Sequence, residues 1–449
     1  MDTQSVRTHL PAQTGQPARR GIVGVLVCAL VLTGCQQAPP PPEAGASFTP
    51  APTSGTPTRG ASTPPPTGRT TVSPTSSSPP PNPGGLSDAE LVGQLFVAYV
   101  YGASATTATP GQRQANLALY GAATGAEIVK RWHLGGIILI DHNNLDPDRA
   151  QFSTGNVDNP NQIAALTAGL QKAARADSGV PLLIGTDQEG GPVQRITNGV
   201  GWRPSERDEA GMSPAALSCS YRSLGSQLLA LGVNQDYAPD ADVVRTATGV
   251  IGDRSFGPDP AIDARDVQAA VAGLQSAGVL ATLKHWPGHG STSTDSHLAL
   301  AVIEETRAQW ESIDRPPFQV AAANAGSIMV GHLALPALDP SGAPATLSPI
   351  LVNGALRHDL GYRGMVITDS LWMAPVQAVG SAGRVAELAI RAGDDLLLMS
   401  PDVPHAYAAL LALVQRDKGF RSLVQASVSR VLAAKAKVAA GPHPLSGNC

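Results

Sequence analysis

Residues 279–297 read VLATLKHWPGHGSTSTDSH. The first five positions, Val279 to Leu283, form a continuous apolar run, which is typical of a strand buried on both faces. Lys284 and His285 end this run, and Pro287 and Gly288 then turn the chain into Ser/Thr-rich sequence of loop composition. A buried strand that delivers charged side chains into a glycine-containing loop is a common source of catalytic residues.

The end of this stretch places Asp295 two residues before His297. A carboxylate close to an imidazole can fix the tautomer of the ring and stabilise its protonated form, which makes the histidine a better proton shuttle. The spacing alone is equally compatible with a metal site or with a solvated polar loop. The residues that surround the stretch must decide between these interpretations.

The same unit recurs along the chain. Seven more short apolar runs are separated by Ala- and Leu-rich segments such as 215–231, 264–277 and 309–324, which we interpret as helices. The seven runs are Gln94–Val100, Gly136–Ile140, Leu182–Thr186, Val233–Tyr237, Ser327–Val330, Met365–Thr368 and Asp395–Met399. Eight strands, each followed by a helix, predict an α/β fold that closes into a (β/α)₈ barrel. An open doubly wound sheet is the alternative, but no GxGxxG follows any run.

Polar residues gather at or after the ends of five runs. They are Asp187, Arg195, Asp236, Asp240, Asp242, Arg254, Lys284, His285, His332 and Asp369. Because the carboxyl ends of barrel strands share one face, we expect an active site there. A single Asp at a strand end is more often a cap or turn residue, and we interpret Asp236, Asp240 and Asp242 in that way.

The chemistry of this set favours a sugar hydrolase. Asp369 ends an apolar strand and should be rigidly held and partly desolvated, which suits a nucleophile. A nucleophilic carboxylate with a separate proton donor is the plan of a retaining glycosidase. The chain has no GxSxG elbow and no HExxH motif. We expect no cofactor and no metal.

The N-terminal part predicts export. Residues 22–32 are apolar and uncharged, which is too short to span a bilayer but suits a signal peptide. The run ends in LTGC at Cys35, which resembles a bacterial lipoprotein signal, so residues 1–34 are expected to be removed and Cys35 to be lipidated. Residues 35–85 hold 15 of the 39 prolines and are predicted to be a disordered tether. The expected location is the outer face of the cell membrane.

Residues 86–449 are expected to be the single folded domain. A formal net charge of −4 gives no indication of nucleic-acid binding. We expect a monomer with a carbohydrate as its partner. Cys219 and Cys449 remain once the signal peptide and the lipidated cysteine are set aside, and a disulfide or two free thiols are equally compatible with the sequence.

The motifs GGIILI, DQEGG, IGDRSFG, KHWPGHGSTSTDSH, PATLS and LGYRGMVITDSLWM resemble family 3 glycoside hydrolases of the β-N-acetylglucosaminidase branch, from about Val92 to Val438. The resemblance implies that Asp369 is the nucleophile and that His297, assisted by Asp295, is the acid/base. It also implies that five residues bind N-acetylglucosamine: Asp187, Arg195, Arg254, Lys284 and His285. The chain departs from the family pattern at Pro192, where Arg is common, at Ser291, where Asp is usual, and at Trp286, where Phe is usual.

The expected activity is therefore retaining exo-hydrolysis of terminal β-linked N-acetylglucosamine. A cell-envelope location makes peptidoglycan-derived GlcNAc-MurNAc the expected substrate. Two alternatives stay open at this point. Phosphate could replace water as the acceptor, which would make the chain a phosphorylase, or the domain could be a catalytically silent cell-wall-binding lipoprotein. His332 is the next candidate proton donor if His297 is not used.

Overall fold

The computed structural model describes residues 83–246, 248–442 and 449. The predicted signal peptide, Cys35 and nearly all of the predicted tether lie outside the described residues. Among the described residues, no helix combines the length and the apolar composition needed to cross a membrane.

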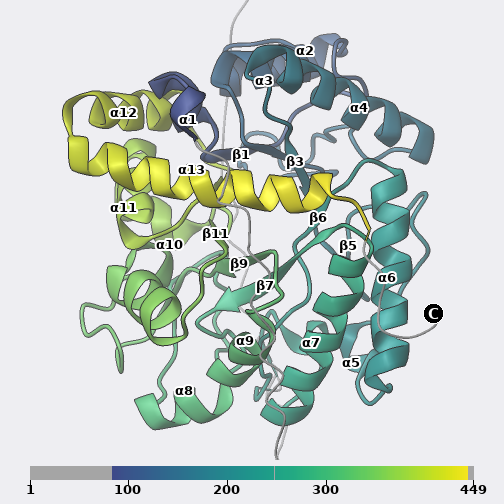
Figure 1. Cartoon of the computed structure of the whole chain (residues 1–449), viewed down its shortest axis with the longest axis vertical. Helices are drawn as coiled ribbons and strands as arrows, with labels where there is room; N and C mark the ends of the chain where they lie inside the picture. The colour runs from purple at the N-terminus through teal and green to yellow at the C-terminus, as the bar shows by residue number, and fades with distance from the viewer. Residues whose placement is uncertain (1–82, 247, 443–448) are drawn as a thin grey trace, which may run out of the picture. The chain divides into compact units, whose positions relative to one another are not determined.

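Eight parallel strands form the centre of the domain (Figure 1). These strands are β1 (Phe96–Ala98), β2 (Gly136–Ile138), β3 (Leu183–Thr186), β6 (Gln235–Asp236), β7 (Leu280–Trp286), β9 (Ser327–Val330), β11 (Met365–Thr368) and β12 (Leu397–Leu398). Their order is β11-β9-β7-β6-β3-β2-β1-β12, and a bridge between Ile367 and Leu396 joins the two ends. The sheet is thus a closed barrel, which confirms the predicted (β/α)₈ fold and rules out the open doubly wound sheet.

Helices surround these strands (Figure 1). They are α1 (Asp88–Gly93), α2 (Pro110–Tyr120), α3 (Gly125–Trp132), α4 (Pro160–Asp177), α5 (Glu206–Glu209), α6 (Pro214–Ala230), α7 (Pro260–Ser276), α8 (Arg307–Ile313), α9 (Arg315–Ala321), α10 (Ala374–Gln377), α11 (Ala382–Ala392), α12 (Val403–Arg416) and α13 (Lys418–Ala439), with a π-helix at Ile350–Asp359. Two short pairs, β4 (Gln188–Gly190) with β5 (Val193–Gln194) and β8 (Ala301–Val302) with β10 (Leu333–Ala334), lie outside the barrel sheet.

Local sequence explains where several helices begin. Asn159, Ser213 and Asp259 each accept a backbone N–H at the start of a helix, and each is followed by proline at the first helical position. The segment predicted as one helix over 309–324 is instead two, because α8 ends at Ile313, with Asp314 as its cap, and prolines open α9. A proline inside a helix removes a backbone hydrogen bond, so the break falls there.

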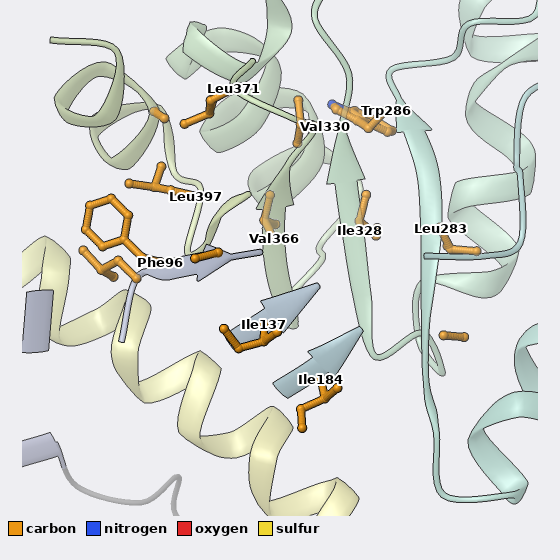
Figure 2. Packing of buried hydrophobic residues seen from close by; sticks show 14 of the residues in the cluster. Phe96, Ile137, Ile184, Leu283, Trp286, Ile328, Val330, Val366, Leu371 and Leu397 are labelled. Carbon is orange, nitrogen blue, oxygen red and sulfur yellow. The ribbon is translucent and has the colours of Figure 1, made fainter. Parts of the chain in front are cut away.

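The strand residues divide between two apolar layers. Val97, Ile138 and Leu183 belong to the cluster inside the barrel, whereas their neighbours Phe96, Ile137 and Ile184 pack in the outer cluster, toward the helices. Figure 2 shows part of this outer cluster. Because successive side chains of a strand point to opposite faces, near-continuous apolar runs are what a strand covered on both faces requires.

Helix α13 covers the amino-terminal end of the barrel. Its Val431 and Ala434 pack with the inner cluster, and its Lys435 Nζ donates to Gln94 Oε1 at 2.6 Å, just before β1. Figure 1 shows the helix crossing in front of the strands. The opposite, carboxyl-terminal end of the barrel is therefore the one available for a site.

The last residue is also attached to this domain. Cys449 forms a disulfide with Cys219 of α6, with 5.4 Å between their Cα atoms. The structure thus favours the disulfide over two free thiols.

Lys435 offers a test of the packing at the closed end. Burial lowers the pKa of its ammonium group to about 7. The unfolded chain binds this proton more tightly than the folded one between about pH 7 and 10.5, so this lysine destabilises the fold most below pH 7. Below pH 7, the lowered pKa reduces the free energy of unfolding by an amount on the order of 5 kcal/mol. Removing Lys435 leaves Gln94 Oε1 unpartnered at a cost of about 1–3 kcal/mol.

We therefore expect Lys435→Met to raise the free energy of unfolding by roughly 2–4 kcal/mol at pH 6. The gain should shrink as the pH rises from 7 toward 10.5. Urea unfolding at several pH values measures this, with the exposed Lys437→Met as the control. A gain that does not vary with pH would contradict a lowered pKa of Lys435 in the folded state.

Candidate active site

A cavity of about 540 Å³ opens at the carboxyl-terminal ends of the strands. Its walls come from β9 and β12 and from the segments after β2, β3, β6, β7 and β11. All eight predicted catalytic and sugar-binding residues line it, namely Asp187, Arg195, Arg254, Lys284, His285, Asp295, His297 and Asp369. The structure thus brings together residues that are up to 182 positions apart in the sequence.

Lys284 organises one wall of the cavity. Its ammonium group is buried and lies 3.1 Å from Asp187 Oδ1 and 2.5 Å from Glu189 Oε1. Arg254 binds Glu189 in a bidentate manner, with N–O distances of 2.7 and 2.9 Å, and Arg195 Nε lies 3.6 Å from Asp187. Such paired charges hold polar groups in fixed positions where a sugar hydroxyl can meet both donors and acceptors.

His285 is held as a cation beside this wall. Its Nδ1 donates to Asp242 Oδ2 at 2.7 Å and lies 3.3 Å from Asp240 Oδ1. Burial opposes the charge, but Asp242 and then Asp240 raise the pKa of the imidazole to about 10. His285 is therefore an imidazolium at neutral pH, with Nε2–H left to donate elsewhere.

The interpretation of Asp236, Asp240 and Asp242 as cap or turn residues is wrong. All three side chains are fully buried. Asp236 accepts the backbone N–H of Gln188, and the other two face His285. Because these contacts join strand ends that are distant in the sequence, local composition did not reveal them.

The buried carboxyl groups of this region have pKa values shifted in both directions. Burial raises the pKa of every carboxyl, but neighbouring cations outweigh it at three of them, whose pKa values are lowered: Asp187, Glu189 and Asp242. Burial dominates at four others, whose pKa values stay raised: Glu206, Asp236, Asp240 and Asp263. Each of the three carboxylates with a lowered pKa contacts Lys284, Arg254 or His285.

Asp240, Asp242 and His285 also form a group of possible metal ligands, with atoms within 4.8 Å of one another. To bind a metal, His285 Nδ1 would have to give up the proton that it donates to Asp242. Arg254 Nε already lies 3.2 Å from Asp240 Oδ2. The acidic oxygens are thus neutralised by the cations of the protein itself, and the set fits an imidazolium better than a metal ion.

Asp369 directly follows β11 and faces the same cavity. Its backbone N–H donates to Val330 O at 2.9 Å, and its Oδ1 accepts the N–H of Ser370 at 2.7 Å. Burial acts to raise the pKa of this carboxyl, but His285, followed by His332 and His297, outweighs it and lowers the pKa. An ionised, fixed carboxylate whose second oxygen accepts no hydrogen bond from the described residues suits a nucleophile.

His332 holds the Asp369 turn instead of offering a proton. Its ring is fully buried, and Nε2 donates to the carbonyl oxygen of Ser370 at 2.9 Å. Its Nδ1 lies 2.7 Å from Thr346 Oγ1. Burial lowers the pKa of this imidazole. With both nitrogens engaged, His332 is a positioning residue, and the structure does not favour it as an alternative proton donor.

His297 and Asp295 form a pair on the loop after β7. His297 Nδ1 lies 2.7 Å from Asp295 Oδ1, which also accepts the backbone N–H of His297 at 2.9 Å. Burial raises the pKa of Asp295, but these contacts with His297 lower it overall. The pair fixes Nδ1–H toward the carboxylate, so Nε2 of a ring that is 45% exposed is left to exchange protons.

The loop that carries the pair is anchored at several points. His289 contacts Thr292 and Ser296 through its two ring nitrogens at 2.6 and 2.8 Å, and burial lowers its pKa to about 4. Gly290 is required, because a Cβ there would lie 2.0 Å from Val243 O. The carbonyl of His297 accepts the N–H of Ala374, which ties the loop to the segment after β11.

The sequence reasoning missed several residues of this site. Glu189 lies in the DQEGG motif, and its place two residues after Asp187 was the available signal. Asp240, Asp242 and His289 support the charged wall and the loop. The apolar floor of the cavity comes from the strand runs themselves, namely Ile138, Ile140, Met329, Leu398 and Met399.

The chain resembles known proteins in sequence. The family model described as the glycosyl hydrolase family 3 N-terminal domain matches residues 93–434. The β-hexosaminidase of Alkalilimnicola ehrlichii is 37% identical over 264 residues, which are 57% of this chain and 74% of the relative. The β-hexosaminidase A of Pseudoalteromonas piscicida is 34% identical over 293 residues, which are 61% of this chain and 47% of that protein.

Solved structures agree with these relatives. A family 3 β-N-acetylglucosaminidase from a Paenibacillus species superposes with a TM-score of 0.69 at 34% identity, covering 81% of this chain and 65% of that chain. A β-N-acetylhexosaminidase from Beutenbergia cavernae gives a TM-score of 0.67 at 30% identity, covering 78% of this chain and 99% of that chain.

The charge on His285 can be tested without a substrate. Its stabilising effect should be complete below about pH 6.5 and be lost as the pH rises through about 10, because the folded pKa is the raised one. In Asp242→Asn, we expect the pKa of the His285 ring to fall by about one to three pH units. NMR titration of histidine-labelled protein measures this.

Asp253→Asn is the control, since it removes an exposed carboxylate from the segment that carries Arg254. If the His285 ring of the unchanged protein titrated near pH 6.5, the assignment of His285 as an imidazolium at neutral pH would be wrong.

Proposed function

The chain belongs to glycosyl hydrolase family 3, and from this premise we propose that it is a retaining exo-β-N-acetylglucosaminidase that hydrolyses terminal β-linked N-acetylglucosamine. The observation that carries the proposal is one cavity that holds the ionised Asp369 carboxylate, the His297–Asp295 pair and a wall of fixed charges. These are the parts that a two-step glycosidase requires.

In the first step, an oxygen of Asp369 attacks the anomeric carbon, and the bond from that carbon to the leaving oxygen breaks. His297, protonated, gives its Nε2 proton to the leaving oxygen. Asp295 accepts Nδ1–H throughout and stabilises the imidazolium before the transfer. His285 lowers the pKa of Asp369 and so keeps the nucleophile ionised.

In the second step, the neutral His297 takes a proton from water, and the water oxygen attacks the same carbon. The bond to Asp369 breaks, and both groups return to their starting states. The two displacements retain the configuration of the anomeric carbon. Because one group serves as acid and then as base, it must face solvent in the second step, and the exposed loop position of His297 meets this need.

The charged wall would bind the sugar. Asp187, Arg195 and Lys284 offer alternating acceptors and donors for hydroxyl groups, and Arg254 and His285 add fixed positive charge. The apolar floor on β2, β9 and β12 gives a surface for the methyl group and ring carbons of N-acetylglucosamine. A polyhydroxylated ligand with one apolar substituent matches this division.

The natural substrate proposed is a peptidoglycan-derived GlcNAc-MurNAc fragment. The support is the predicted export of the chain and its tether, which would place the domain outside the cell membrane. The second candidate step, transfer to phosphate, has no specific support in the cavity.

The anchor gives a prediction of its own. If Cys35 is lipidated, Cys35→Ala should release active enzyme from the membrane fraction into the soluble fraction. Activity per molecule should be unchanged, because the predicted tether stands between Cys35 and the cavity-lining residues in the sequence. Fractionation and an assay with a nitrophenyl N-acetylglucosaminide measure this. Unchanged membrane association of the variant would contradict a lipid anchor at Cys35.

The acid/base pair gives a sharper prediction. A nitrophenolate can leave without being protonated, whereas the leaving oxygen of a sugar must receive a proton. His297→Ala should therefore slow hydrolysis of a natural disaccharide by about 10²–10⁴-fold and slow nitrophenyl release much less. The nitrophenyl substrate should show a burst followed by slow turnover, and azide should restore the slow step because it needs no base.

Asp295→Asn should give a milder form of the same pattern, and Asp369→Asn should abolish both steps without azide rescue. The matched control is His405→Ala, which removes a histidine that also pairs with an aspartate, Asp402 at 2.6 Å, but on the surface at α12. If His297→Ala slowed the hydrolysis of both substrates equally and azide had no effect, the loop would be a positioning element. That result would contradict the proposed acid/base role of His297.

A further inference from the structure

A second cavity of about 460 Å³ adjoins the active-site cavity. It lies between the segments after β2 and β3, and Asp158, Thr197 and Asn198 are among its lining residues. Three residues line both cavities, namely His142, Asn144 and Arg195. The two cavities are therefore neighbours with a shared boundary, and neither Asp369 nor the His297 loop lines the second one.

The order of the strands gives the direction in which the second cavity extends. In the ring of eight strands, β3 stands four places from β11, which is directly across the barrel. If Asp369 bonds the anomeric carbon, as proposed above, a sugar ring that spans the cavity points its opposite carbon, C4, toward β3. There lie Asp187 and Arg195. The second cavity thus begins beyond the non-reducing side of the bound sugar.

Few side-chain contacts close the boundary between the two cavities. Arg195 is 45% exposed, and its guanidinium contacts Asp187 at 3.6 Å. Its other N–H groups have no hydrogen-bond partner among the residues that the structure describes. Pro192, at the same edge, is exposed and brings no side-chain donor. Neither residue closes the non-reducing side in the way that a strictly monosaccharide pocket requires.

The walls of the second cavity are already in place. Asn156 is buried, and its amide binds both Ile140 N and Val100 O, at 3.1 Å each. Asp141 accepts Ser153 Oγ at 2.6 Å and lies 2.9 Å from His142 Nδ1. Asn198 Nδ2 donates to Asp158 O at 3.1 Å, which joins the two segments. The surface of the second cavity is therefore preformed, and ordering it on ligand binding would cost little free energy.

The lining chemistry indicates the class of ligand. Carboxylates, amides and a hydroxyl face the space, and Asp141 and Asp158 outnumber the single full cation, Arg195. This excess of negative charge disfavours a phosphate or carboxylate ligand, whereas hydroxyl and acetamido groups find both donors and acceptors. A neutral saccharide fits this chemistry.

We infer that the second cavity binds a further saccharide unit carried on O4 of the bound N-acetylglucosamine, so that the enzyme releases a disaccharide from the chain end as well as a monosaccharide. The inference rests on the proposed function, because it uses Asp369 as the site of bond cleavage. The chemical step is unchanged, and the new element is a glycone of two units in place of one.

The test uses the nitrophenyl β-glycosides of N-acetylglucosamine and of N,N′-diacetylchitobiose. From the disaccharide substrate, we expect nitrophenol to appear without a lag, together with intact diacetylchitobiose. An enzyme that accepts one unit must first remove the terminal sugar, so nitrophenol would then appear after a lag and free N-acetylglucosamine would come first. Initial rates at low substrate concentration keep transglycosylation from making diacetylchitobiose.

Filling the cavity provides the second measurement. Thr197→Trp should lower the ratio of diacetylchitobiose to N-acetylglucosamine among the first products by at least tenfold, whereas Thr197→Ser should leave the ratio unchanged. The lag measurement on the unchanged enzyme stands even if the tryptophan variant does not fold. Hydrolysis of the monosaccharide substrate with a lag on the disaccharide substrate would overturn this inference alone. Failure to hydrolyse either substrate would instead overturn the proposed function.

Discussion

The burial of Lys284 is the constraint on which the site depends. A buried ammonium group is tolerated when carboxylates neutralise it, and Asp187 and Glu189 do so from β3 and from the hairpin strand β4 that follows it. Glu189 in turn fixes Arg254, and the next residue after Lys284, His285, needs Asp242 and Asp240. Each cation thus specifies its partners on neighbouring strands, so barrel closure and the charge pattern of the cavity are coupled. Lys435 at the opposite end of the barrel has an amide as its partner, and burial lowers the pKa of its ammonium group to about 7.

The fold could be predicted from the sequence because it depends on short-range information. Strands covered on both faces are mostly apolar, and each of the eight runs overlaps one of the eight barrel strands. The candidate site was also largely predictable, since polar residues that end such runs must meet at one face. The network behind them was not, because the contact of Asp242 with His285 spans 43 residues and leaves no local pattern. Asp240 and Asp242 look like turn residues until the strands are assembled.

Titration explains why the proposed acid/base pair lies on a loop and not on a strand. The pKa values of the buried histidines of the site are shifted away from the usual value of a histidine. The carboxylates raise the pKa of His285 to about 10, whereas burial lowers the pKa of His289 to about 4 and also lowers the pKa of His332. A group that must give a proton and then take one cannot be fixed in either state. The carboxylates of the charged wall therefore make His285 unfit for proton exchange, and burial does the same to His289 and His332. His297 is outside that network, half-exposed, and tied to it through its backbone and Asp295.

The same division accounts for the proposed nucleophile. As a nucleophile, Asp369 would need the opposite property, a single ionised state in a fixed place, and it has the strand end, the Ser370 N–H and the nearby imidazolium of His285 to ensure it. The proposed nucleophile belongs to the rigid barrel, and the proposed proton donor belongs to the loop. The carbonyl of His297, which accepts the N–H of Ala374 in the segment after β11, is the contact that keeps the two in one reaction geometry. A loop held in this way stays close to the nucleophile while its imidazole remains open to water.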